Sequence, residues 1–458
     1  MLIVSIVVIV ITVLLLLNKS FFHVSSSIFL TVISSLFVLW LVYLSDTFVF
    51  LQPLLSYVES LDVSKLVLNV LLWFLLFIGA MNFSGKELMS EKWSIIFLSV
   101  FWTIFSTVLI WFSLYYLSLF VDLWLGLRES MLFGVIISPT DSVTVLGLMK
   151  KLGLNKRLLA QLEGESLFND GVSVVLFLLI LSFVFGSSNG DASFLWELIL
   201  REVWWGLLLG TLLWILAHFL IKASHNDSIV TTLVMLSVIL WGGQIALMTH
   251  VSGSLAIVIA GLIIGNTIMK MDLNHYVEEH LRYFWKLIEK FLNVFIFLLI
   301  GICVIYIIQT PIPWFMYVAV ITIVFFARVI VMIFGGVLIK HHQLSHFQLV
   351  WLFSFGWLKG ALSIALVLML HLAHADIMIA LTWCVVLFSI IVQGSSLPGL
   401  IRALEIKWND QDKLMDDVRE CDVANEHVKS IGDLEEGQVL LYSHDSEILP
   451  DVMKEGEW

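Results

Sequence analysis

The sequence predicts an all-α polytopic membrane protein with about 13 transmembrane helices and a short cytosolic C-terminal tail. Hydrophobic residues make up 60% of the 458 positions and charged residues only 13%. The mean hydropathy is +1.02, well outside the range of soluble domains. Apolar runs of about 20 residues recur from the first residue to about Arg402, each long enough to cross a hydrocarbon core of about 30 Å.

The apolar runs define the expected spans in chain order. Their approximate ranges are 2–17, 24–44, 64–82, 93–119, 130–149, 160–185, 198–221, 228–249, 252–269, 284–308, 313–339, 347–371 and 376–401. The first run lacks a basic n-region and a small-residue cleavage site, so we expect a retained helix and not a signal peptide. Residues 45–64 contain Pro53, Glu59 and Asp62, and we expect them to stay outside the membrane or at its interface.

The basic residues are concentrated in alternate loops. Loops after odd-numbered spans hold 13 Lys or Arg residues, whereas loops after even-numbered spans hold 3, namely Lys65, Arg128 and Arg201. Cytoplasmic loops are enriched in Lys and Arg. The asymmetry predicts a multi-pass protein of the cell membrane (plasma or inner membrane) with its N-terminus outside and its tail in the cytoplasm.

The formal charge of −12 lies mainly in the tail, because residues 402–458 hold 16 acidic residues against 6 Lys or Arg. An acidic tail argues against nucleic-acid binding and predicts a solvated appendage. Cys303, Cys384 and Cys421 form neither a paired framework nor a zinc-binding spacing. We therefore expect no disulfide, no structural metal and no cofactor.

The fifth span, 130–149, contains a predicted break. Pro139 removes a backbone donor and clashes with the carbonyl four residues earlier, so the helix should unwind or kink there. Thr140 and Asp141 follow at this point. Unwound backbone at membrane depth leaves carbonyl groups able to ligate a cation, although a simple proline kink would explain Pro139 taken alone.

The sixth span carries Glu163, Glu165, Ser166, Asn169 and Asp170. A charge at the bilayer centre costs about 2.5 to 3.5 kcal/mol on insertion scales, so intramembrane acids indicate an ion or proton site, with a buried structural charge as the alternative. Ser166 and Asp170 are four residues apart and share a helical face. Their oxygens suit a hard cation such as Na⁺. Glu165 lies about 140° from Asp170 around the helix and should face a different neighbour.

Two basic residues also occur inside apolar spans, Arg328 in the eleventh and Lys359 in the twelfth. Gly356 and Gly360 flank Lys359 and weaken its helix, which makes the twelfth span a second candidate for a break. Interrupted helices in corresponding positions of two halves are typical of inverted-repeat secondary transporters. The sequence therefore predicts an inverted-repeat secondary transporter with two broken helices and its site near the midplane of the membrane.

At these residues the chain resembles the cation:proton antiporter-1 family of Na⁺/H⁺ exchangers, especially its prokaryotic branch. The resemblance rests on ISPTDSV at 137–143, EGESLFNDG at 163–171, VSGSLAIVIAGLIIGN at 251–266, AR at 327–328 and GWLKGALSIAL at 356–366. Together with the hydropathy pattern it covers nearly all of residues 1–401, but not the tail.

The resemblance implies an electroneutral secondary active antiporter that serves pH homeostasis and is not an enzyme. It would exchange one Na⁺ or Li⁺ for one H⁺ across the lipid bilayer. It implies a homodimer in which a core domain, about 93–185 and 313–401, moves in an elevator-like step against a dimerisation domain. The remaining spans of the exchanger domain, 1–401, would form the dimerisation domain, and 402–458 would be the acidic tail.

By the same matching, Asp170 is the shared carrier of Na⁺ or H⁺, and Na⁺ would be bound by Asp170, Ser166 and Thr140. The resemblance assigns supporting roles in the ion site to Asp141, Asn169 and Glu165. It pairs Arg328 with Glu165 and makes Lys359 a compensating charge. Lys359 stands where the family usually has arginine, and Ser142 where it usually has a second proline.

Two alternatives remain open from the sequence. The same site could serve K⁺/H⁺ exchange or a passive cation channel, because selectivity depends on cavity dimensions. An intramembrane hydrolase with Ser166 or Ser173 as nucleophile would need a nearby histidine. None of the 13 histidines has a local spacing that suggests one.

Overall fold

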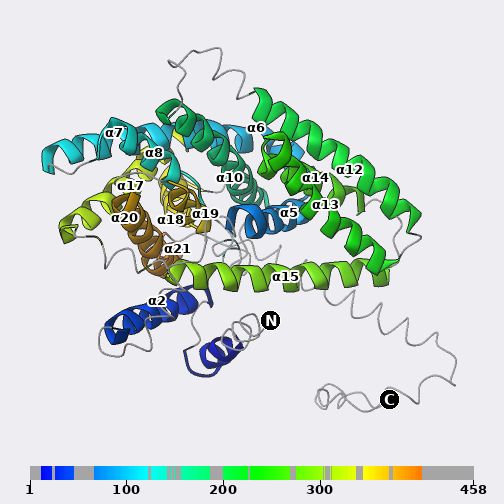
Figure 1. Ribbon diagram of the computed structural model, residues 1–458, viewed down its shortest axis with the longest axis horizontal. Coiled ribbons are helices and arrows are strands. Elements are labelled where there is room, and N and C mark those ends of the chain that lie inside the picture. The colour runs from blue at the N-terminus through cyan, green and yellow to red at the C-terminus, as the bar shows by residue number, and fades with distance from the viewer. Residues whose placement is uncertain are drawn as a thin grey trace, which may run out of the picture. The chain divides into compact units, whose positions relative to one another are not determined.

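The computed structural model describes most of the chain up to residue 404 (Figure 1). The described residues are 12–22, 26–45, 67–121, 125–141, 146, 149, 156–185, 200–224, 227–268, 275–302, 304, 310, 312–336, 344–370 and 375–404. They form helices and short connections, and their only strand-like pairing is an isolated bridge. The predicted all-α class is therefore confirmed. The acidic tail lies outside the described residues, apart from its first three positions.

The helices follow the predicted spans in chain order, with η marking five-residue π-helical segments. They are η1 (Asn18–Phe22), α2 (Ser26–Ser45), η3 (Val67–Leu71), α5 (Leu72–Asn82), α6 (Gly85–Ile96), η4 (Phe97–Phe101), α7 (Trp102–Val121), α8 (Leu127–Ile137), α10 (Lys156–Phe185), η5 (Arg201–Trp205), α12 (Gly206–Ala223), α13 (Ser228–Thr249), α14 (Gly253–Ile268), α15 (His275–Ile302), α17 (Trp314–Gly335), α18 (His346–Gly356), α19 (Ala361–Leu368), α20 (Ala375–Phe388), η6 (Ser389–Gln393) and α21 (Gly394–Ala403).

Six of the described helical stretches are long and apolar enough to cross a membrane. They are Gly85–Val121, Arg157–Phe185, Arg201–Ala223, Ser228–Thr249, Trp314–Gly335 and Ala375–Ala403. Shorter apolar helices cover Ile28–Leu44, Leu72–Asn82 and Gly253–Thr267. The chain is thus a polytopic membrane protein. The expected total of about 13 spans includes residues outside the described ones and stays a prediction.

Helix α13 starts and ends where the hydropathy predicts. Asp227 caps its first turn, because the side chain accepts hydrogen bonds from the backbone N–H groups of Ile229 and Val230 at 2.8 and 3.2 Å. His250 ends the helix with a left-handed backbone (φ 53°), and its N–H bonds back to the last turn.

Helix α15 begins nine residues before its predicted start at residue 284. Its first turns are amphipathic: Val277, Leu281 and Trp285 recur every four residues and are buried. On the exposed side, Arg282 forms an ion pair with Glu278 at 2.5 Å. The sequence prediction missed this part because it relied on uninterrupted apolar runs, and these turns carry charges on one face.

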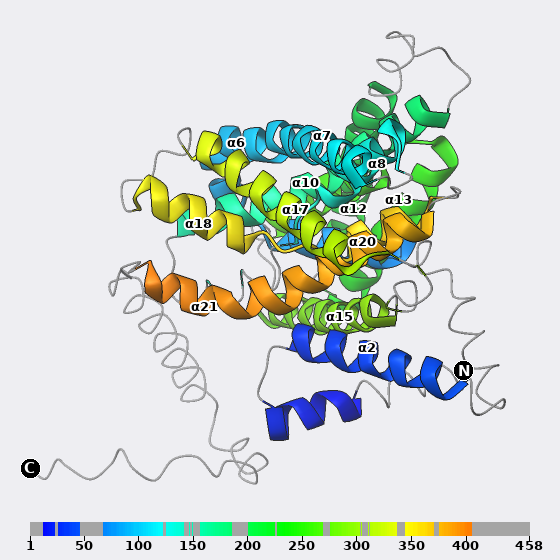
Figure 2. The same ribbon diagram turned by 90° about the vertical axis from the view of Figure 1, so that its left-hand side faces the viewer.

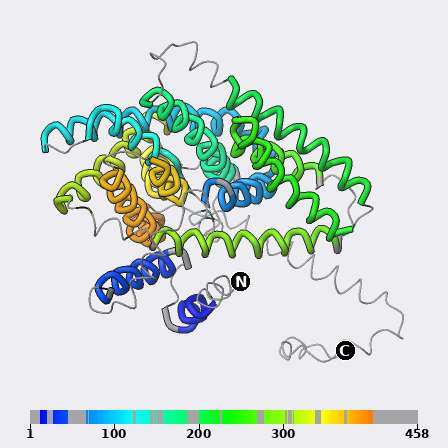
Figure 3. The backbone as a smooth tube through the Cα atoms, in the orientation of Figure 1, coloured from blue at the N-terminus to red at the C-terminus, as the bar shows by residue number. Residues whose placement is uncertain are grey.

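The described helices pack in two groups (Figures 1 and 2). In one group, α14 packs on α5, α12 and α13, and α2 packs along α15. In the other, α7 packs on α8 and α17, and α17 packs on α18 and α20. Helix α15 also contacts α5 and α13 of its own group, and it contacts α19, which packs on α20 and α8 of the other group (Figure 3). Helix α10 contacts both α8 and α14.

Candidate ion-binding site

The first broken segment follows α8. The helix ends at Ile137, and residues Ser138, Pro139 and Thr140 are not helical. Ser138 closes the last turn with a hydrogen bond of 3.3 Å from its N–H to the carbonyl of Val135. Pro139 has no N–H to continue the helix, and its ring clashes with the carbonyl four residues earlier. The helix therefore stops at the position that the sequence indicates.

The second broken segment joins α18 to α19. Helix α18 ends at Gly356, and α19 begins at Ala361 after the extended Gly360. A Cβ atom added to Gly360 would lie only 2.6 Å from the Cβ of Asp141. Glycine at this position is what allows the two backbones to approach each other.

The two broken segments cross and bond to each other. The backbone N–H of Asp141 donates to the carbonyl of Leu358 at 2.8 Å, as one antiparallel bridge. Because each segment has left its helix, each has main-chain groups to offer the other. Two residues predicted from separate halves of the chain, Asp141 and Gly360, thus become neighbours.

Both buried cations of this region bind the open end of α8. Lys359 Nζ donates to the carbonyl oxygens of Ser138 and Pro139 at 3.2 and 3.0 Å. Arg328 Nη2 donates to the Ser138 carbonyl at 2.6 Å, and its guanidinium lies 4.8 Å from the centre of the Trp357 ring. A helix C-terminus carries unsatisfied carbonyls and partial negative charge, which favour cations there.

The expected ion pair between Arg328 and Glu165 is not formed, and that prediction is corrected. The salt bridges between described residues do not include these two side chains. Arg328 instead donates a hydrogen bond to the carbonyl of Ser138, which has no partner within α8 because the helix ends there. Compensation of the buried acid by Arg328 and Lys359 remains a prediction.

Glu165 belongs to a buried hydrogen-bond network with Thr140 and Asn169. The Thr140 hydroxyl lies 3.3 and 3.4 Å from the two carboxylate oxygens of Glu165. Asn169 Nδ2 donates to Thr140 Oγ1 at 3.0 Å and to Glu165 Oε1 at 3.2 Å. Glu165 is 1% exposed and Asn169 is 0% exposed, so this network lies behind the surface that Asp170 shares with the cavity.

Two further residues, Thr103 and Ser173, belong to this network and were not predicted to do so. Thr103 Oγ1 lies 2.5 Å from Asn169 Oδ1, and the hydroxyl of Ser173 donates to the same oxygen at 3.1 Å. Ser173 stands four residues after Asn169, so helical spacing could have found it. Thr103 lies on α7, and nothing in the sequence indicates that α7 packs beside this part of α10.

A separate contact holds the beginning of α10 in place. Glu91 of α6 is buried, accepts a hydrogen bond from Gln161 Nε2 at 2.6 Å and forms an ion pair with Arg157. Both partners are on α10, within ten residues of Glu165 and Ser166. The α6 helix therefore sets the position of the helix that carries most of the candidate site residues.

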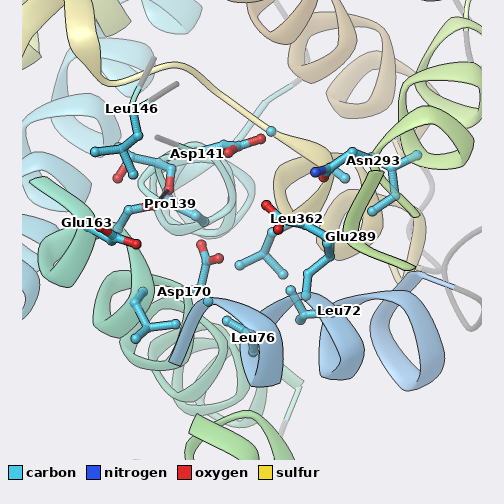
Figure 4. A pocket seen from close by; sticks show the side chains of 18 of the residues that line it. Leu72, Leu76, Pro139, Asp141, Leu146, Glu163, Asp170, Glu289, Asn293 and Leu362 are labelled. Carbon is cyan, nitrogen blue, oxygen red and sulfur yellow. Dashed lines mark hydrogen bonds between the residues drawn. The ribbon is translucent and has the colours of Figure 1, made fainter. Parts of the chain in front are cut away.

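A cavity of about 390 Å³ opens beside the crossing point, and Figure 4 shows its wall. Thr140, Asp141, Ser166 and Asp170 line it, together with Glu163. Glu165, Asn169, Arg328 and Lys359 do not line it. The predicted site residues therefore form two groups. One group lines the cavity, and the other forms hydrogen bonds to residues of the first broken segment.

The candidate site residues that line the cavity, Thr140, Asp141, Ser166 and Asp170, have oxygens as their polar side-chain atoms. Ser166 Oγ donates to the main-chain carbonyl of Thr140 at 2.8 Å, which joins α10 to the first broken segment. Carboxylate, hydroxyl and carbonyl oxygens around a cavity of this kind can bind a hard cation or a proton.

Residues 1–403 match the family model described as "Sodium/hydrogen exchanger, transmembrane". The chain belongs to the sodium/hydrogen exchanger family. It is 31% identical over 359 residues to the Na(+)/H(+) antiporter NhaP of Pseudomonas aeruginosa, covering 76% of this chain and 83% of that one. It is also 31% identical to the Na(+)/H(+) antiporter NhaH of Halobacillus aidingensis, covering 78% and 87% of the two chains. These matches confirm the resemblance and the transporter class of this exchanger.

The fold is also that of a solved structure. The exchanger aligns with the sodium proton antiporter MjNhaP1 of Methanocaldococcus jannaschii with a TM-score of 0.61. The alignment covers 82% of this chain and 98% of that one at 20% sequence identity. At this level of identity the likeness establishes the fold of the exchanger. It confirms the predicted antiporter fold.

Proposed function

We propose that this membrane protein exchanges Na⁺ for H⁺, one for one, with Asp170 as the shared carrier. The observation that carries the proposal is the position of Asp170, which lines a cavity with Asp141, Thr140 and Ser166 where two broken helices cross. The names of its relatives NhaP and NhaH, both called Na(+)/H(+) antiporters, support the same reaction.

Competition for one carboxylate provides the coupling. Asp170 must be neutralised before it can pass a barrier of low dielectric constant, because a bare charge there is costly. Either a proton or Na⁺ neutralises it, but not both together. Each passage therefore carries one ion species, and net exchange follows when the two directions carry different species.

The residues at the cavity have distinct proposed tasks. Asp170, Ser166 and Thr140 bind Na⁺ with oxygen atoms, and Asp141 adds a second carboxylate at the cavity wall. Asn169 and Glu165 hold the Thr140 hydroxyl from behind, through hydrogen bonds of 3.0 to 3.4 Å. Lys359 and Arg328 compensate the buried acids while closing the end of α8.

We further propose a homodimer in which residues 93–185 and 313–401 form the moving core and the remaining spans the dimerisation domain. The two groups of packed helices agree with this division. The cavity is assigned to the cytoplasmic side. Asn82 and Glu163 line it together with Glu289, and Asn82 and Glu163 each lie near a helix end that the distribution of Lys and Arg puts in the cytoplasm.

The proposal is tested with purified protein in liposomes that enclose a pH-sensitive dye. Addition of Na⁺ or Li⁺ should collapse an imposed pH gradient, and clamping the voltage should leave the rate unchanged if one charge moves each way. Asp170→Asn should abolish exchange. Asp376→Asn, which alters an exposed carboxylate on α20, is the matched control and should retain it.

Three outcomes of this experiment would change the assignment. Wild-type rates in Asp170→Asn would exclude Asp170 as the carrier. A response to K⁺ in place of Na⁺ would favour K⁺/H⁺ exchange on the same site, and ion flux without proton coupling would indicate a channel.

We propose no enzymatic reaction for the chain. The hydrolase alternative would need Ser166 or Ser173 to be activated by a base. Ser166 Oγ donates to a main-chain carbonyl at 2.8 Å, and Ser173 Oγ donates to an amide oxygen at 3.1 Å. Neither acceptor is a general base. Na⁺-dependent proton flux in the absence of ester or peptide hydrolysis would separate the two classes.

A further inference from the structure

Helix α20, in the proposed core, bonds to the end of α15, in the proposed dimerisation domain. Trp383 Nε1 donates a hydrogen bond of 2.6 Å to the main-chain carbonyl oxygen of Ile300. Both residues are buried, Trp383 at 3% and Ile300 at 1% exposure. The bond therefore joins two helices that an elevator-like step would move past each other.

The carbonyl of Ile300 is available because α15 ends two residues later, at Ile302. The last four carbonyls of an α-helix have no partner within the helix. The N–H of Val304, four residues after Ile300, donates to the carbonyl of Gly301 at 3.3 Å. Because a buried carbonyl without a donor is costly, the indole N–H of Trp383 stabilises this contact between the two helices.

The bond lies beyond the end of the cavity. Along α15 the cavity is lined as far as Phe297, and Ile300, one turn later, does not line it. Along α19 the cavity is lined as far as Leu362, and Ala365 and Leu366, one turn later, are buried and do not line it. The two helices contact each other. In the proposed orientation both run outward from the cytoplasmic side, so their packed turns form the closed, extracellular side of the site.

Such a bond can exist in only one of the two conformations of an exchanger. An elevator-like step displaces the core along the dimerisation domain, and a hydrogen bond is lost when its donor and acceptor move apart by a few ångströms. Trp383 therefore stabilises the conformation in which the cavity opens to the cytoplasm. A contact made in one conformation and not in the other shifts the population toward the first.

We infer that Trp383 is a positioning residue that keeps the extracellular side closed and so sets the balance between the two conformations. The inference rests on the proposed function. Trp383 does not line the cavity, and it acts by holding α20 against α15. Loss of one buried hydrogen bond should lower the ratio of the cytoplasm-open to the outward-open conformation by about three- to tenfold.

The test is Na⁺/H⁺ exchange in everted and right-side-out membrane vesicles, which expose the cytoplasmic and the extracellular face. Trp383→Phe keeps an aromatic ring and removes the N–H. The apparent affinity measured on each face scales with the fraction of the protein that is open to that face. The extracellular KM for Na⁺ divided by the cytoplasmic KM should therefore fall about three- to tenfold, by the same factor as the ratio of the conformations.

The matched control is Trp285→Phe. Trp285 is also buried, and its Nε1 donates to Met235 Sδ at 3.1 Å. Both of these residues belong to the proposed dimerisation domain, so loss of their bond should leave the KM ratio at the wild-type value. General damage to the packing would lower the maximal rate or raise both KM values without changing their ratio.

Thiol labelling tests the same inference without transport. Ile300→Cys, in a protein whose three cysteines are replaced by serine, puts a thiol at a buried position of the closed side. The bond to Trp383 uses the main-chain carbonyl and is kept. A membrane-impermeant maleimide applied to right-side-out vesicles should react about three- to tenfold faster when Trp383→Phe is added.

An unchanged or raised KM ratio in an active Trp383→Phe protein would overturn the inference while leaving the proposed function intact. If Trp383→Phe is inactive, an unchanged labelling rate would overturn it. An equal fall of the KM ratio in Trp285→Phe would also overturn it. Absence of exchange in the wild-type vesicles would instead contradict the proposed function itself.

Discussion

Lys359 Nζ donates a hydrogen bond of 3.0 Å to the carbonyl oxygen of Pro139, so a cation from one broken helix closes the end of the other. This contact explains how two interrupted helices can meet inside a membrane without leaving all their main-chain groups unpaired. It also makes the stability of the crossing depend on Lys359, whose predicted role was to compensate the charge of buried acids.

Replacing Lys359 should therefore destabilise the exchanger as a folded protein. Lys359→Met removes a donor from the buried carbonyls of Ser138 and Pro139, and we expect a loss of about 1 to 3 kcal/mol. Lys359→Arg keeps the charge and several donors and should retain both stability and exchange. Thermal unfolding in detergent measures the effect. Lys290→Met, at an exposed position of α15, is the control. A Lys359→Met protein as stable as the control would contradict the role given to this contact.

The close approach of the two broken segments predicts that Gly360 tolerates no side chain. In Gly360→Ala the new Cβ would lie 2.6 Å from the Cβ of Asp141, so one backbone must shift. We expect a rise in the apparent KM for Na⁺ of at least about tenfold, since misplacement by about 1 Å can cost about a hundredfold at a functional site. Dye-based exchange in liposomes measures it.

Gly399→Ala is the matched control, because no atom lies within 4 Å of a Cβ added there. That variant should transport like wild type. If Gly360→Ala did the same, the observed packing of Gly360 against Asp141 would not matter for ion binding.

The network behind the cavity predicts a role for Thr103, which does not line the cavity beside Asp170. Thr103→Val removes the hydroxyl that lies 2.5 Å from Asn169 Oδ1. Asn169 then holds Thr140 less firmly, and we expect a several-fold loss of exchange with about 1 kcal/mol lower stability.

Thr107→Val serves as the comparison, because the Thr107 hydroxyl donates to the main-chain carbonyl of Thr103 within the same helix, at 2.8 Å. It should lose little exchange. Equal losses in both variants would indicate a general effect on α7 and not a specific effect on Asn169.

The contacts of Arg328 predict that exchanging its charge with that of Glu165 will not restore the protein. Arg328 donates to the Ser138 carbonyl at 2.6 Å, and a carboxylate at position 328 has no hydrogen to donate. Glu165→Arg and Arg328→Glu should each lower the unfolding temperature. The double variant should be no more stable than the worse single variant. Recovery of wild-type stability in the double variant would point to a direct ion pair.

Local sequence patterns determined much of this exchanger. Uninterrupted apolar stretches predicted the helices, and Pro139, Gly356 and Gly360 predicted the two breaks, because each of these effects acts within a few residues of the chain. The helical repeat also placed Ser166 and Asp170 on one face and directed Glu165 away from it. The amphipathic first turns of α15 were not predicted, because a search for uninterrupted apolar runs does not detect a helix with one charged face.

The tertiary structure alone decided which groups meet. The sequence indicated that Arg328 and Lys359 lie inside the membrane. It did not indicate that both would bind the main-chain carbonyls at the end of α8 and not a carboxylate. It likewise gave no sign that Thr103 reaches Asn169 or that Glu289 faces the Asp170 cavity. These contacts join residues far apart in the chain, and they depend on how helices pack, which side-chain periodicity along one helix does not specify.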